Sequence, residues 1–163
     1  MLSIYTVCFF GHRQVDNYFE AEEAVEKILG DITSRHEYVE CLVGRDGDFD
    51  QIVASAVLRL KKAKDSGNIS LTWVMPYLKS EYTKNQDNYD NYYDSVEVCE
   101  ESASAHPKAA IQIRNKVMVD RSDYSVFYVK KKQGGAYQTM RYAANQGKEY
   151  INLADDNSVS VMS

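Results

Sequence analysis

Glycine-bearing turns follow three strand-like segments of the chain, where polar and charged side chains accompany the glycines. These turns are Gly11-His12-Arg13, Gly44-Arg45-Asp46-Gly47 and Gln133-Gly134-Gly135. A glycine turn lets backbone N–H groups approach a phosphate closely, and the first turn of a following helix adds unpaired donors and a positive dipole end. Because the carboxyl ends of parallel strands meet at one edge of a sheet, the turns predict a phosphate site there.

Polar side chains near these turns could complete such a site. Arg13 could contact a phosphate in a bidentate manner. Thr139 lies one helical turn beyond Gly135 and could donate its hydroxyl. Asp50 or Asp120 could accept hydrogen bonds from ribose hydroxyls, and the same two carboxylates are the candidates for general acid/base catalysis.

Each feature also has a structural explanation. A single glycine after a strand is commonly only a turn, and Gly134-Gly135 could be a tight link between strand and helix. Asp50 could cap the helix that follows it, and Asp120 could brace a helix end near residue 119. The spacing matches neither GxGxxG nor GxxxxGK[ST], so spacing alone leaves both explanations open.

Strand-like and helix-like segments alternate along the chain. The expected strands span 3–10, 38–43, 69–75, 96–99, 124–129 and 150–153, and the expected helices span 18–35, 52–63, 107–119 and 134–145. This alternation predicts a Rossmann-like three-layer α/β sandwich, with a mostly parallel sheet and helices on both faces. We expect a single domain over 1–155 and a polar tail over 156–163.

The segment 79–94 is polar, tyrosine-rich and expected to be irregular. It contains Tyr82, Tyr89, Tyr92 and Tyr93. One interpretation is an exposed connection with surface tyrosines. The other is a lid or partner surface, whose rings stack on a base or pack on a second subunit.

Composition bounds the possible partners. The 163 residues carry a formal net charge of -5, which argues against a broad basic face and hence against nucleic acid as a partner, although a local basic patch could still exist. No apolar run approaches the roughly 20 residues that span a bilayer, and the apolar start is expected to be a strand rather than a signal peptide. Three widely spaced cysteines predict neither a disulfide framework nor a metal site, and fit a reducing cytoplasm.

Four segments together resemble the DUF1273/YpsA-like proteins of the SLOG (Smf/DprA–LOG) superfamily. They are VCFFGHR (Val7–Arg13), GRDGDFDQIVA (Gly44–Ala54), RNKVMVDRSDYSVFYV (Arg114–Val129) and GGAYQTMRYAANQGKEYINL (Gly134–Leu153). The resemblance covers nearly the whole chain in the same order. It implies a Rossmann-like sheet and a pocket for a nucleotide or nucleotide-derived ligand.

Carried over residue by residue, the resemblance assigns twelve residues to the pocket. They are Gly11, His12, Arg13, Gly44, Gly47, Asp50, Asp120, Ser122, Asp123, Gly134, Gly135 and Thr139. Arg45 stands where the family usually has the second glycine of a pair, and its side chain could add a phosphate contact. The resemblance also implies a homodimer.

The phosphoribohydrolase branch of the superfamily carries the motif PGGxGTxxE, from which this chain departs. Gln133 replaces the proline, Tyr137 replaces the third glycine, and no glutamate follows Thr139. That glutamate is expected to serve glycosidic-bond cleavage. We therefore expect a non-catalytic sensor or regulatory domain that binds a nucleotide-type ligand and requires no cofactor. The alternatives are an N-glycosidase acting on nucleoside monophosphates or ADP-ribose-like compounds, and single-stranded DNA binding in the manner of DprA.

Overall fold

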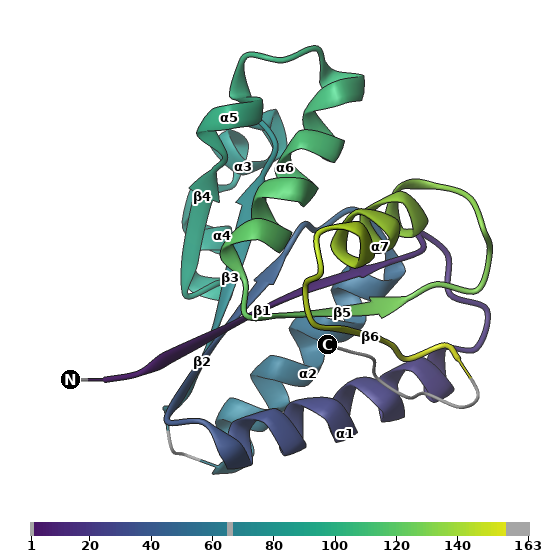
Figure 1. Ribbon diagram of the computed structural model, residues 1–163. Coiled ribbons are helices and arrows are strands. Elements are labelled where there is room, and N and C mark those ends of the chain that lie inside the picture. The colour runs from purple at the N-terminus through teal and green to yellow at the C-terminus, as the bar shows by residue number, and fades with distance from the viewer. Residues whose placement is uncertain (1, 65–66, 156–163) are drawn as a thin grey trace.

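The strand-like segments form one parallel sheet in the computed structural model, which describes residues 2–64 and 67–155 (Figure 1). Its strands are β1 (Ile4–Gly11), β2 (Tyr38–Val43), β3 (Ile69–Met75), β4 (Ser95–Val98), β5 (Tyr124–Tyr128) and β6 (Tyr150–Asn152). They lie in the order β4-β3-β2-β1-β5-β6, and every neighbouring pair is parallel. The predicted polar tail, 156–163, lies outside the described residues.

Helices cover both faces of this sheet, which confirms the predicted α/β sandwich (Figure 1). They are α1 (Tyr18–Arg35), α2 (Asp48–Lys64), α3 (Ser80–Lys84), α4 (Gln86–Tyr92), α5 (Glu100–Ala103), α6 (Pro107–Arg121) and α7 (Gly135–Asn145). One apolar core packs α1 and α2 against the sheet, and a second packs α6 and α7 against the opposite face. Among the described helices, none has the length and apolar character needed to cross a bilayer.

The sequence explains why α1 forms where it does. Its buried residues Ala21, Val25, Leu29 and Ile32 recur at intervals of three and four, which places them on one face of the helix. At the start of the helix, the Asn17 side chain accepts a hydrogen bond from the Glu20 amide at 3.1 Å. Burying each large aliphatic side chain contributes about 1.5–3 kcal/mol relative to leaving it in water.

The expectation of an irregular 79–94 segment is wrong, because this segment folds into the short helices α3 and α4. They cover the fully buried Trp73 of β3. Ring centroids of Tyr82, Tyr89 and Tyr93 lie 5.9, 5.1 and 5.4 Å from that of Trp73. These three tyrosines therefore pack against Trp73 within the chain, Tyr93 buried and Tyr82 and Tyr89 partly buried, whereas Tyr92 remains 37% exposed.

The strand order reverses at β1, which creates the crevice typical of ligand sites in such sheets. From β1 the chain adds β2, β3 and β4 on one side, and it later returns to add β5 and β6 on the other. The connections after β1 and β5 consequently diverge at the carboxyl ends of these strands. Gly11, the last residue of β1, lies at this point and pairs with Tyr128 of β5.

We expect Gly11→Ala to destabilise the fold, because a Cβ at this position would overlap Cβ and Cγ of Phe49. Overpacking of this kind lowers the free energy of unfolding by about 1–3 kcal/mol. Gly30→Ala is the control, since no heavy atom lies within 4 Å of the position that its Cβ would take. It should stabilise α1 by about 0.5–1 kcal/mol. Urea denaturation measures both, and an unchanged stability of Gly11→Ala would contradict this packing.

Candidate functional site

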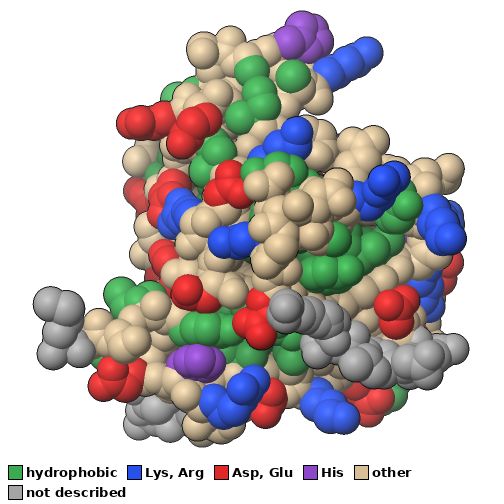
Figure 2. Space-filling model, in the orientation of Figure 1, with side chains coloured by type: hydrophobic (Ala, Val, Ile, Leu, Met, Phe, Trp, Pro, Cys, Tyr) green, Lys and Arg blue, Asp and Glu red, His purple; other side chains and the backbone are tan. Residues whose placement is uncertain are grey.

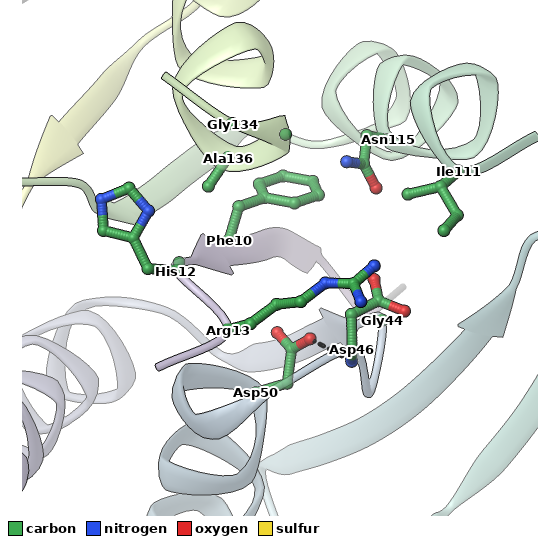
Figure 3. Close-up of a pocket in the computed structure, with 12 residues that line it drawn as sticks. Phe10, His12, Arg13, Gly44, Asp46, Asp50, Ile111, Asn115, Gly134 and Ala136 are labelled. Carbon is green, nitrogen blue, oxygen red and sulfur yellow. Dashed lines mark hydrogen bonds between the residues drawn. The ribbon is translucent and has the colours of Figure 1, made fainter. Parts of the chain in front are cut away.

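A pocket of about 230 Å³ occupies the crevice between the carboxyl ends of β1 and β2 and the start of α7 (Figure 3). We call it the site pocket. It is lined by Phe10, Gly11, His12, Arg13, Gly44, Asp46, Asp50, Ile111, Asn115, Gly134, Gly135 and Ala136. The structure therefore brings together residues of all three glycine-bearing turns, although these turns lie far apart in the sequence.

Arg13 contributes the cation of the site pocket. Its side chain extends across the pocket toward Gly44 and Asp46 (Figure 3). The Arg13 carbonyl accepts a hydrogen bond from the Asp48 amide at 2.8 Å, which fixes the turn to the start of α2. Gly47 packs under this turn, where a Cβ would overlap Cα of Arg13. Among the described residues, the Arg13 guanidinium has no hydrogen-bond or ion-pair partner, so its donors remain available.

The N-terminus of α7 contributes backbone donors on the opposite side of the pocket. Gly134 precedes the helix with φ of 94°, a conformation that favours glycine, and no side chain in the described ranges 2–64 and 67–155 caps the helix. The first intrahelical bond runs from the Gln138 amide to the Gly134 carbonyl. The amides of residues 135–137 consequently have no acceptor within the helix, and the positive end of the helix dipole faces the pocket.

A buried arginine holds the second turn in place. Arg114 of α6 is 1% exposed and donates to the carbonyls of Val74 at 3.0 Å and Gly44 at 3.4 Å. It also forms an ion pair with Asp46. Gly44 must lack a side chain here, because a Cβ would lie 2.9 Å from Nη2 of Arg114.

Asn115 links this arginine to α7. Its Oδ1 accepts hydrogen bonds from Arg114 Nε at 3.1 Å and Nη2 at 2.9 Å. Its Nδ2 donates to Thr139 Oγ1 at 3.1 Å, and Thr139 donates to the Gly135 carbonyl at 2.9 Å. Thr139 is fully buried and does not line the site pocket. Its hydroxyl braces the first turn of α7 instead of facing a ligand.

Asp50 is the carboxyl group with the most perturbed environment in the pocket. Burial, reinforced by the nearby charge of Asp46, raises the pKa of Asp50 to about 7. The Asp50 carboxyl group accepts a hydrogen bond from the Asp46 amide at 2.7 Å, close to the start of α2. The same side chain also lines the site pocket. Asp46 and Asp50 together provide acceptors on the side of the pocket opposite α7 (Figure 3).

His12 fastens the loop that leads from β5 to α7. Its Nε2 accepts hydrogen bonds from the amides of Lys130 at 3.0 Å and Lys131 at 3.1 Å. An accepting Nε2 requires the neutral imidazole, with its proton on Nδ1. Burial and the charge of Lys131 lower the pKa of His12, which favours this neutral form.

A second pocket, which we call the lysine pocket, adjoins the site pocket on the side of this loop. Its lining residues are His12, Arg13, Gln14, Val15, Asp16, Tyr128, Lys130, Lys131, Gln133 and Gly134, and its volume is about 420 Å³. The two pockets share His12, Arg13 and Gly134. Figure 2 shows basic and acidic side chains mixed over this face of the molecule, with acidic ones near α5.

Three residues predicted for the site lie elsewhere. Asp120, Ser122 and Asp123 precede β5 and thus lie at the amino end of the sheet, opposite the pocket. Asp120 accepts a hydrogen bond from the Tyr142 hydroxyl at 2.7 Å, Ser122 donates to the Met118 carbonyl, and Asp123 accepts from the Thr6 amide. Their assignment to the ligand is corrected to a bracing role at this edge. Of the two candidate catalytic carboxylates, Asp50 alone lines the pocket.

Arg45 also turns away from the site pocket. Its guanidinium lies 4.9 Å from the ring centroid of Tyr89 and 5.7 Å from that of Trp73. The φ of Arg45 is +57°, a left-handed conformation that costs a non-glycine residue about 1–2 kcal/mol. Glycine adopts this conformation without strain, and the aromatic contacts of Arg45 offset the cost here.

Sequence reasoning did not assign the pocket-lining residues Phe10, Asp46, Ile111, Asn115 and Ala136 to the site, nor Arg114, which supports it. A signal was present, because Ala110, Arg114 and Met118 recur every four residues on the buried face of α6. A charged residue in such an apolar stripe is rarely buried without a partner. The adjacent pair Arg114-Asn115 therefore indicated a buried polar network.

No sequence-family profile and no curated protein matches the chain. Two solved structures of DNA processing protein A (DprA) do. The Streptococcus pneumoniae protein matches with a TM-score of 0.66 at 14% identity, over 90% of this chain and 49% of its own. The Helicobacter pylori protein matches with a TM-score of 0.59 at 13% identity, over 90% of this chain and 63% of its own.

The chain has the DprA fold. It spans between about half and two thirds of the length of these two DprA chains. This similarity confirms the predicted Rossmann-like fold, whereas it does not distinguish the DUF1273/YpsA-like branch.

The comparison overturns the expectation that excluded nucleic acid as a partner. The H. pylori DprA, which has this fold, binds single-stranded DNA. The expectation rested on the net charge of -5, but net charge does not describe local charge. Here Arg13, Lys130 and Lys131 line one pocket.

We expect Arg114→Met to lower the free energy of unfolding by about 3–5 kcal/mol, because it removes one partner of a buried ion pair. Arg121→Met in the same helix is the matched control. Arg121 pairs with Glu97 on the surface, where the two side chains are 36% and 35% exposed, so its loss should cost at most about 1 kcal/mol. Equal losses in chemical denaturation would contradict the role assigned to Arg114.

The raised pKa of Asp50 predicts a pH-dependent stability. An unfolded aspartate releases its proton near pH 3.9, whereas folded Asp50 retains it up to about pH 7. Protonated Asp50 therefore stabilises the folded state fully below about pH 3.9, and this stabilisation is lost as pH rises through 7. The free energy of unfolding changes by up to about 1.4 kcal/mol per pH unit over this range. The difference in unfolding free energy between wild type and Asp50→Asn should change accordingly from about pH 4 to pH 8. A constant difference would contradict the assignment.

Proposed function

We propose that this chain binds a nucleotide-type ligand in the site pocket and acts as a sensor or regulatory domain. The observation that carries the proposal is the Arg13 guanidinium, which has no partner among the described residues and shares one pocket with the N-terminus of α7. A phosphate between them would receive charge-assisted hydrogen bonds from the side chain and from backbone amides. Each bond of this kind contributes about 1.5–3 kcal/mol.

The polar groups of the pocket suit the sugar as well as the phosphate. Asp46 and Asp50 provide acceptors for ribose hydroxyls, while Phe10, Ile111 and Ala136 provide an apolar surface. Arg13 and the start of α7 donate hydrogen bonds and so favour an anionic group, whereas Asp46 and Asp50 accept hydrogen bonds and so favour hydroxyl groups. We also propose the finer placement in the DUF1273/YpsA-like branch, on the four sequence segments quoted above.

Single-stranded DNA is a second candidate ligand, favoured by the reported binding mode of the H. pylori DprA. A strand would present phosphates to the same donors and extend into the lysine pocket. Its binding would weaken steeply with salt, because each neutralised phosphate releases counterions.

Substitution of Arg13 tests the proposal. We expect Arg13→Gln to weaken AMP binding by at least about tenfold, the equivalent of one charge-assisted hydrogen bond. Arg35→Gln is the control, since Arg35 is an exposed arginine paired with Asp31 at the far end of α1. Isothermal titration calorimetry measures both, and fluorescence anisotropy with an oligo(dT) strand tests the second candidate.

Two results would count against this function. One is a folded wild type that binds neither AMP nor ADP, and the other is an Arg13→Gln variant with wild-type affinity. Free base released from AMP by wild type but not by Asp50→Asn would instead establish the N-glycosidase alternative.

A further inference from the structure

The lysine pocket differs in charge from the site pocket that it adjoins. Lys130, Lys131 and Arg13 line it, and Asp16 is the one carboxylate among its lining residues. The site pocket combines Arg13 with Asp46 and Asp50. An anionic group is therefore favoured more on the lysine side, where cations outnumber carboxylates, than on the side of Asp46 and Asp50.

The residues shared by the two pockets show on which side of the site pocket the lysine pocket lies. His12 and Gly134 lie on the side of the site pocket away from Gly44 and Asp46 (Figure 3). A first phosphate held at Arg13 and α7 would consequently have carboxylates on one side and lysines on the other. A second phosphate avoids the carboxylates and enters the lysine pocket.

The side chain of Lys131 is available for such a group. The described part of the chain offers its ammonium no ion pair, whereas Lys130 Nζ lies 3.6 Å from a carboxylate oxygen of Glu20. His12 accepts hydrogen bonds from the backbone amides of both lysines, which holds this loop against the turn after β1. The lysines are thus positioned by the same histidine that lines both pockets.

We propose that the lysine pocket binds a second anionic group of the ligand held in the site pocket, so that the preferred ligands are nucleoside diphosphates and their derivatives. This inference rests on the proposed function, since it assumes a first phosphate at Arg13. Beyond the proposed function, it specifies the diphosphate class of ligand and assigns recognition of the second phosphate to Lys131.

Calorimetric titration of AMP and ADP, in the absence of divalent cations, tests the proposal. Wild type should bind ADP about tenfold more tightly than AMP. Lys131→Gln should reduce this ratio to about threefold or less, because it removes one cation without changing the backbone amide. Lys132→Gln is the matched control, since it makes the same charge change one residue away, at an exposed position that does not line the pocket. The control should retain the wild-type ratio.

The outcomes separate this inference from the proposed function. Equal wild-type affinities for AMP and ADP would overturn the inference and leave nucleotide binding intact. An equal loss of preference in Lys131→Gln and Lys132→Gln would overturn it as well, because it would indicate general charge rather than a site. Tighter binding of oligo(dT) than of ADP would overturn the inference, because it would indicate a DNA strand as the preferred ligand. A wild type that binds neither nucleotide would overturn both proposals.

Discussion

The buried guanidinium of Arg114 is the constraint on which the candidate site depends. It contacts the carbonyls of Val74 and Gly44 and the carboxylate of Asp46, and so joins α6 to the ends of β2 and β3. Since each of its donors must be satisfied once it is buried, the chain has little freedom in where the second turn lies. Through Asn115 and Thr139 the same network reaches the first turn of α7. One side chain thereby positions two of the three turns.

This framework leaves the charges at the crevice unevenly distributed. The ion pair with Arg114 compensates Asp46, and burial favours protonated Asp50, so the carboxylate side is less negative than its composition indicates. The Arg13 side chain, which extends toward Asp46, and the start of α7 across the pocket present donors that the described residues do not use. An acidic chain can therefore offer a locally positive site, so its net charge alone does not exclude a phosphate-bearing partner.

Where the hydrophobic pattern was strong, sequence predicted structure well. The bounds of β2, β3 and α1 match the predicted 38–43, 69–75 and 18–35, because period and apolar content are clear there. The helix expected from 52 begins at Asp48, since the glycine-rich approach resembles a turn. The helices α3 and α4 depend on covering Trp73, a tertiary requirement that local sequence does not express. For the site, topology alone placed the three glycine turns together, whereas the roles of Arg114 and Asn115 follow from contacts between distant segments.

A crystal structure of the chain with ADP tests the central claim most directly. We expect a phosphate within hydrogen-bonding distance of both the Arg13 guanidinium and the amides at the start of α7, with the sugar toward Asp46 and Asp50. A nucleotide bound at another surface, with Arg13 and the first turn of α7 facing solvent, would contradict the proposed site.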